Sequence, residues 1–430
     1  PYTTELQKSG RLGVDAAECS GIESKLGQLL YANVDNFGST GKDPLDPAYI
    51  KMVKDLQLGG VLPKTRITNQ SKIAEVNKKL QEVSSQPLLI GVDRMMLEMS
   101  AFGLGYGAGF LNQIAPNLSN ECFKREVFLD AFLHRVSGVN HALGPTIERA
   151  DGETFLSRNI SEVAPKARDL IKVFHNAGIA TTNKHFPYTP STYNLHDTTV
   201  DDKISKTAVN KKLEPFRELA SESDFLMTTH VLNSNIDKEN VATFSPEWIR
   251  ILREDVKYDG LIMTDGIFMF NKYPDSVKKM ASQWPQDQVP LKSEHAIFTA
   301  RSILAGHDIV LVESIAADTY KIYKELLFLA CQDKPIGKEF RARVNQSYER
   351  IISYKNKHTK ELRFSDPVPV DLYEEATDIY ANANYGRTPL CSNPKFETWV
   401  KKAEAYMKNA TSQDSSATYN SSPKKSRGVQ

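Results

Sequence analysis

Short apolar runs alternate with longer amphipathic stretches from residue 26 to about residue 332. Continuous apolar runs bounded by turn residues are typical of buried strands, whereas apolar positions spaced three or four residues apart predict helices. Eight runs fit the strand pattern: residues 29–34, 60–63, 87–92, 140–145, 179–183, 225–229, 261–264 and 309–312. This repeated alternation predicts an α/β protein folded as a (β/α)8 TIM-type barrel. The alternative is a doubly wound open sheet, which would require some of the predicted strands to be wrong.

Helix boundary signals agree with this alternation. Ser245 is followed by Pro246 and Glu247, which is the pattern of an N-cap, a proline at the first helical position and an acidic first turn. A helix that begins near Val163 places apolar residues on one face and is expected to stop at Gly178, a residue type common just after a helix.

The pattern changes after residue 332, and we divide the chain into three parts. The barrel is expected over residues 1–332 and a helical C-terminal extension over 333–409, with one long helix near 338–357. The tail, residues 410–430, is rich in Ser, Thr, Asn and Lys and is predicted to be disordered.

Composition narrows the choice of partners. The chain has 430 residues, with 54 basic and 53 acidic side chains and a net charge of +1. Nothing in that balance suggests a nucleic-acid partner, because proteins that bind polyanions carry a basic patch. The longest apolar stretches, such as residues 326–331, are too short to span a bilayer. The sequence leaves the oligomeric state unknown.

Cysteine usage gives little sign of a metal site. Cys19, Cys122, Cys331 and Cys391 lie far apart and form no CxxC pair, so we predict no metal site and no cofactor. Four cysteines in so long a chain do not imply a disulfide framework, although they allow one bridge.

The compartment stays open. The chain starts at Pro1 without a methionine, so either a targeting segment was removed or the chain was trimmed. Removal would fit an extracytoplasmic location, and a cytoplasmic location is the alternative.

Ionisable residues follow several predicted strands. Asp93 ends the run 87–92, Lys184 and His185 end the run 179–183, and Asp265 ends the run 261–264. Residues at the carboxyl ends of barrel strands face the barrel mouth, where TIM-barrel active sites lie. Neighbours on a regular strand point to opposite sides, so both Lys184 and His185 can face a ligand only if the strand has ended.

Each of these residues suits one task in sugar chemistry. Asp265 could act as a nucleophile on an anomeric carbon, with a helix cap or loop hydrogen bond as its structural alternative. Asp93, Lys184 and His185 are suited to hydrogen bonds with sugar hydroxyls. His196, farther along the loop after His185, is a candidate general acid/base or an ordinary surface histidine. His230 ends the run 225–229, and we expect it to be a satisfied structural residue.

Several segments resemble glycoside hydrolase family 3 in its β-N-acetylhexosaminidase-like branch. The stretch 177–187, which ends in Lys-His-Phe-Pro, looks like the hallmark segment of that family. Four other segments are similar to family segments in the same order: residues 224–230, 242–245, 258–265 and 305–308. The likeness covers about residues 22–330 and implies a barrel that cleaves glycosides.

The resemblance assigns roles to residues. Asp265 matches the nucleophile and His196 the acid/base of a retaining mechanism, in which a glycosyl-enzyme forms and is then hydrolysed. Asp93, Lys184 and His185 match residues that hold sugar hydroxyls. Asn194 stands where the family has the aspartate of an Asp-x-His dyad and would orient His196.

The chain also departs from the family pattern. An asparagine can orient an imidazole but cannot stabilise the imidazolium. The loop after Asp93 lacks the family's glycines and two arginines, and Glu153 takes the place of a third arginine.

We therefore expect a retaining β-glycosidase that acts on a saccharide or glycoconjugate, with slow or narrow activity. The alternative is a catalytically weak or inactive member that serves as a saccharide- or protein-binding barrel.

Overall fold

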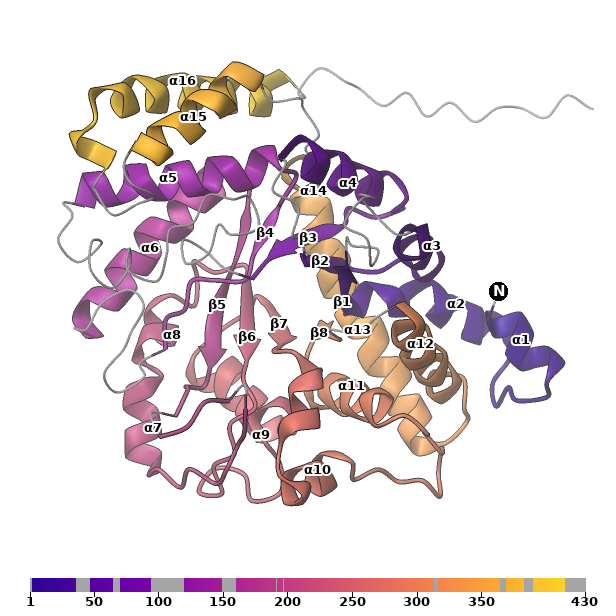
Figure 1. Ribbon diagram of the computed structural model, residues 1–430. Coiled ribbons are helices and arrows are strands. Elements are labelled where there is room, and N and C mark those ends of the chain that lie inside the picture. The colour runs from indigo at the N-terminus through magenta and orange to yellow at the C-terminus, as the bar shows by residue number, and fades with distance from the viewer. Residues whose placement is uncertain are drawn as a thin grey trace, which may run out of the picture.

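A computed structural model describes residues 2–35, 47–64, 70–93, 120–148, 160–190, 192–195, 197–312, 316–363, 369–382 and 390–413. Eight parallel strands stand at the centre of the molecule, and helices surround them (Figure 1). The strands are β1 Leu30–Asp35, β2 Gly60–Lys64, β3 Leu89–Val92, β4 His141–Ala142, β5 Ala180–Phe186, β6 Phe225–Thr228, β7 Leu261–Thr264 and β8 Val310–Leu311. Each predicted run overlaps one of them, and the TIM-type barrel is confirmed.

The strand order in the sheet is β7-β6-β5-β4-β3-β2-β1-β8, so β1 and β8, the first and last strands in sequence, pair with each other. The remaining gap between β7 and β8 is bridged by Met263 and Ile309. The N–H of Thr264 donates to the carbonyl of Ile309 at 3.1 Å. The strands therefore form a closed barrel, and all their carboxyl ends meet at one mouth.

Asp308, two residues before β8, fixes this closure. Its side chain is fully buried, and its carboxylate accepts the backbone N–H of Ile262 in β7 at 3.0 Å. The guanidinium groups of Arg253 and Arg350 pair with it at 3.3 Å each, and the Ser347 hydroxyl donates to it at 3.2 Å. One carboxylate thus ties two strands to the surrounding helices.

The barrel interior contains a polar layer across β1 to β5. The Tyr31 hydroxyl lies 3.1 Å from Nδ1 of His141, whose Nε2 lies 2.7 Å from the Thr182 hydroxyl. Burial lowers the pKa of His141 to about 3, so the ring is neutral. A Cβ at Gly60 would lie 2.3 Å from the Tyr31 ring, and one at Gly91 would lie 2.1 Å from its hydroxyl oxygen. Glycine at these two positions makes room for the tyrosine.

The helices form an outer layer around the sheet (Figure 1). Their bounds are α1 Tyr2–Lys8, α2 Ala16–Leu26, α3 Pro47–Leu56, α4 Gln70–Glu82, α5 Asn120–Val136, α6 Ile160–Asn176, α7 Lys206–Lys212, α8 Glu214–Glu218, α9 Pro246–Arg250, α10 Asp275–Ala281, α11 Glu294–Ala305, α12 Ala316–Ala330, α13 Pro335–Lys357, α14 Thr359–Leu362, α15 Val370–Asn382 and α16 Pro394–Gln413. The predicted cap is confirmed, because the Ser245 hydroxyl accepts the N–H of Trp248 at 3.2 Å. In the described part of the chain, no helix combines the length and the apolar character needed to cross a membrane.

The C-terminal helix α16 lies against α5 on the outside of the barrel, and α15 packs on α16 (Figure 1). Trp399 of α16 is fully buried and packs edge to face on Phe132 of α5, with 5.2 Å between ring centroids. Its indole N–H donates to the carbonyl of Leu372 in α15 at 2.9 Å. The helical extension is thus observed, and α16 continues to Gln413, past the predicted start of the tail at residue 410. The boundary at residue 332 stays a prediction, and residues 414–430 lie outside the described part.

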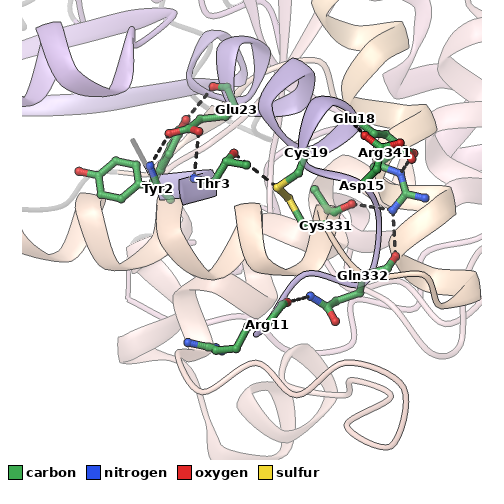
Figure 2. The surroundings of a disulfide bond; sticks show 12 residues. Tyr2, Thr3, Arg11, Asp15, Glu18, Cys19, Glu23, Cys331, Gln332 and Arg341 are labelled. Atoms are coloured by element: carbon green, nitrogen blue, oxygen red, sulfur yellow. Dashed lines mark hydrogen bonds and ion pairs between the residues drawn. A yellow bond between two sulfur atoms is a disulfide. The ribbon is translucent and has the colours of Figure 1, made fainter. Parts of the chain in front are cut away.

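All four cysteines are paired, which goes beyond the single bridge that the sequence allowed. Cys122 of α5 bonds to Cys391, just before α16, and Cys19 of α2 bonds to Cys331 at the end of α12. Figure 2 shows the bridge between Cys19 and Cys331. Beside it, Arg341 pairs with Glu18 at 2.8 Å. The linked cysteines lie 312 and 269 positions apart in the sequence and meet only in the folded chain. The spacing of cysteines along the sequence alone could therefore not reveal either pair.

Replacing Asp308 by alanine should lower the free energy of unfolding by about 3 kcal/mol. The variant removes the carboxylate that two guanidinium groups pair with and leaves the buried N–H of Ile262 without its acceptor. Guanidinium chloride denaturation measures the loss. Asp255→Ala is the control, because that exposed carboxylate lies 3.9 Å from Arg250 and should contribute at most about 0.5 kcal/mol. Equal losses in the two variants would contradict the role given to Asp308.

Candidate functional site

Ionisable side chains gather at the carboxyl ends of four strands. Asp93 follows β3, Glu148 follows β4, and Asp265 follows β7. Lys184 and His185 lie near the carboxyl end of β5 itself. Because all eight strands run parallel, these residues share the barrel mouth. The predicted residues Asp93, Lys184, His185 and Asp265 are therefore brought to one end of the barrel.

Lys184 and Asp93 form an ion pair across the mouth. The Lys184 ammonium donates to Asp93 Oδ1 at 3.0 Å and lies 3.3 Å from the Asp93 carbonyl oxygen. Lys184 is buried, whereas about half of the Asp93 side chain is exposed. The pair thus combines a held cation with a carboxylate that solvent or a ligand can reach.

The end of β5 is irregular where Lys184 and His185 lie. The strand continues to Phe186, so the expectation that it ends before Lys184 was wrong. Its register against β6 shifts between Asn183 and Phe186. A shift of this kind changes the direction in which side chains point, and here both neighbours contact residues at the mouth.

His185 lies between two carboxylates. Its Nδ1 lies 2.8 Å and 2.9 Å from the two carboxylate oxygens of Glu148, and its backbone N–H also donates to Glu148. Its Nε2 lies 3.9 Å from Asp265 Oδ2. Burial by itself would lower the pKa of His185, but the charge and hydrogen bond of Glu148 raise it above its ordinary value.

Asp265 is held in place by the backbone around it. Its N–H donates to the carbonyl of Thr228 at 2.9 Å, and its Oδ1 accepts the N–H of Gly266 at 2.7 Å. Burial alone would raise the pKa of Asp265, but His185, His230 and Lys184 lower it below its ordinary value. The carboxylate is therefore ionised at neutral pH.

His230 lies behind Asp265 and is fully buried. Its Nε2 lies 3.0 Å from the carbonyl oxygen of Gly266, and its Nδ1 lies 2.6 Å from the Thr243 hydroxyl. Its ring packs on Phe270, with 4.5 Å between centroids. These contacts agree with the structural role expected for His230.

His196 lies outside the described residues, as do Glu153 and the segment 94–101. The residues on either side of His196 are held by hydrogen bonds. The Tyr273 hydroxyl, from the segment after Asp265, donates to the carbonyl of Leu195 at 2.6 Å. The Asn194 amide donates to Asp197 Oδ2 at 3.1 Å. A carboxylate thus lies beside Asn194. It comes from Asp197, three positions after position 194, where the family dyad has its aspartate.

Glu148 is the site residue that the sequence analysis missed. It follows the predicted strand 140–145 by three residues, in the sequence Pro145-Thr146-Ile147-Glu148. Thr146 pairs with Lys184, and the N–H of Ile147 donates to the carbonyl of Lys184 at 2.8 Å. A search for carboxylates within three residues of a predicted strand end would have found it.

The comparisons with known proteins point to one family. The family model described as the N-terminal domain of glycosyl hydrolase family 3 matches residues 21–354. A β-hexosaminidase of Xylella fastidiosa (strain M12) is 31% identical over 233 residues, which make up 50% of this chain and 69% of that protein.

Two solved structures share the fold. A fungal multi-domain family 3 β-N-acetylglucosaminidase has a TM-score of 0.65 at 20% identity; the match covers 85% of this chain but only 42% of that one. The β-N-acetylhexosaminidase from Beutenbergia cavernae DSM 12333 has a TM-score of 0.62 at 21% identity, over 78% of this chain and 98% of that one. With the family match over most of the barrel, these findings show that the chain belongs to glycosyl hydrolase family 3.

Proposed function

We propose that this protein is a retaining β-glycosidase, similar to β-N-acetylhexosaminidases, that acts on a saccharide or glycoconjugate. The observation that carries the proposal is the ionised carboxylate of Asp265 at the mouth of a family 3 barrel, 3.9 Å from the His185 ring. The β-hexosaminidase name of the bacterial relative supports the substrate class.

In the proposed mechanism, Asp265 attacks the anomeric carbon and His196 protonates the departing glycosidic oxygen. A glycosyl-enzyme ester results. His196 then takes a proton from water, the water oxygen attacks the anomeric carbon, and the Asp265 carboxylate leaves. The two displacements retain the configuration of the sugar.

Asp93 and Lys184 would bind sugar hydroxyls. Lys184 has three donors, and its contacts with Asp93 fix the ammonium at the mouth. The exposed carboxylate of Asp93 accepts hydrogen bonds from hydroxyls. The pair thus offers a donor and an acceptor side by side, the arrangement that vicinal hydroxyls require.

Asp265→Asn should lower kcat/KM on aryl β-glycosides by about a thousandfold or more, since the amide cannot form the glycosyl-enzyme. Release of the chromophore from a panel that starts with aryl N-acetyl-β-hexosaminides measures this loss. Asp259→Asn, which changes an exposed aspartate just before β7, is the matched control and should keep wild-type activity. If the wild type releases no chromophore from any member of the panel, the barrel is a binding protein and the glycosidase proposal is wrong.

Placing a carboxylate at position 194 should raise turnover by about tenfold or more, because an imidazolium at His196 would gain its counter-charge. Asn194→Asp alone puts a second negative charge beside Asp197, so the double variant Asn194→Asp/Asp197→Asn is the better test. It moves the carboxylate without changing the net charge. Steady-state kinetics of both variants measure the effect. Unchanged turnover in the double variant would contradict His196 as the acid/base.

A further inference from the structure

Three of the four hydrogen-bonding contacts of Glu148 are with one residue, His185. Glu148 is 6% exposed, and both of its oxygens face Nδ1 of His185. The backbone N–H of His185 also donates to it, and the Thr189 hydroxyl donates to Oε1 at 2.7 Å. These four contacts fix the position of the carboxylate and leave it little capacity to bind other groups.

Both nitrogens of the His185 ring face acceptors. Nδ1 faces Glu148, and Nε2 faces Asp265 Oδ2. Nδ1 is within hydrogen-bond distance of Glu148, whereas Nε2 lies 3.9 Å from Asp265 Oδ2, within ion-pair range but beyond a hydrogen bond. Two carboxylates so close to one ring favour its imidazolium form by their charge.

We propose that Glu148 is a positioning residue that holds His185 as an imidazolium whose Nε2–H faces Asp265. This inference deepens the proposed function and rests on it. Glu148 touches neither the sugar nor the reacting atoms. It acts through His185, which serves as a fixed cation beside the nucleophile and transfers no proton.

The charges around the ring agree with this role. Glu148 and Asp265 favour the imidazolium, Lys184 opposes it, and the pKa of His185 is raised in spite of burial. The benefit falls on the second step of the mechanism. There the ester bond between Asp265 and the sugar breaks, and negative charge returns to the carboxylate. A cation already in place stabilises that charge without reorganisation.

Glu148→Gln should therefore slow hydrolysis of the glycosyl-enzyme more than its formation. With an aryl glycoside that has a good leaving group, kcat should fall by about tenfold or more and KM should fall with it, because the intermediate accumulates. A burst of released chromophore should precede the steady state. The loss of Glu148 lowers the pKa of His185, so the imidazolium is lost at lower pH and the alkaline limb of kcat moves down in pH.

Two variants separate this role from a structural one. Glu148→Asp keeps the charge on a shorter side chain and should recover part of kcat. Glu126→Gln removes another buried carboxylate, in α5, and should leave kcat and KM unchanged. A higher KM with unchanged kcat in Glu148→Gln would overturn the proposal, since it would mean that Glu148 supports only substrate binding.

A second measurement does not depend on turnover. NMR titration of the histidine rings, with the His185 signal assigned from a His185→Gln variant, should show a lower pKa in Glu148→Gln than in the wild type. If His185 titrates identically in both, the inference is wrong even in an active enzyme. If the shift is present but no aryl glycoside is cleaved, the glycosidase proposal fails while the Glu148–His185 pairing stands.

Discussion

Closure of the barrel is the constraint on which the rest of this structure depends. The site exists because eight parallel strands end at one mouth, and they do so only if β7 and β8 join. Asp308 makes that join, because it binds the backbone of Ile262 and two guanidinium groups from the outer helices. A buried carboxylate with four partners is stable only as a complete set, so the strand contact and the helix contacts form together.

Some residues in the family segments hold the barrel together. His307 contacts the Thr228 hydroxyl at 2.8 Å, and burial lowers its pKa to about 3, so it is a neutral structural group. Asp224, just before β6, accepts the N–H of Thr181 in β5 at 2.9 Å and pairs with His175 of α6 at 2.6 Å. It repeats at β5 and β6 the arrangement that Asp308 makes at β7 and β8. Such residues carry a family likeness through contacts that build the barrel.

The mouth shows a different use of charge. There the acidic and basic groups are linked as Asp93 to Lys184 and as Glu148 to His185 to Asp265. Each carboxylate has a cation near it, which offsets the cost of burying the charges and keeps Asp265 ionised. Asn194 stands where the family has an aspartate, but a negative charge is still present beside it, because the Asp197 carboxylate lies 3.1 Å away.

The sequence by itself determined the strands, since apolar runs between turn residues report burial directly, and every predicted run overlaps a strand. It also identified Asp93 and Asp265, because each comes directly after such a run. Glu148 and the two disulfides depended on the tertiary structure, for one physical reason. A carboxylate or a thiol acquires its role from the group that meets it across the fold, and the partners of Cys19 and Cys122 lie 312 and 269 positions away. Periodicity reports which face of an element is buried, but only the closed barrel decides which side chains meet there.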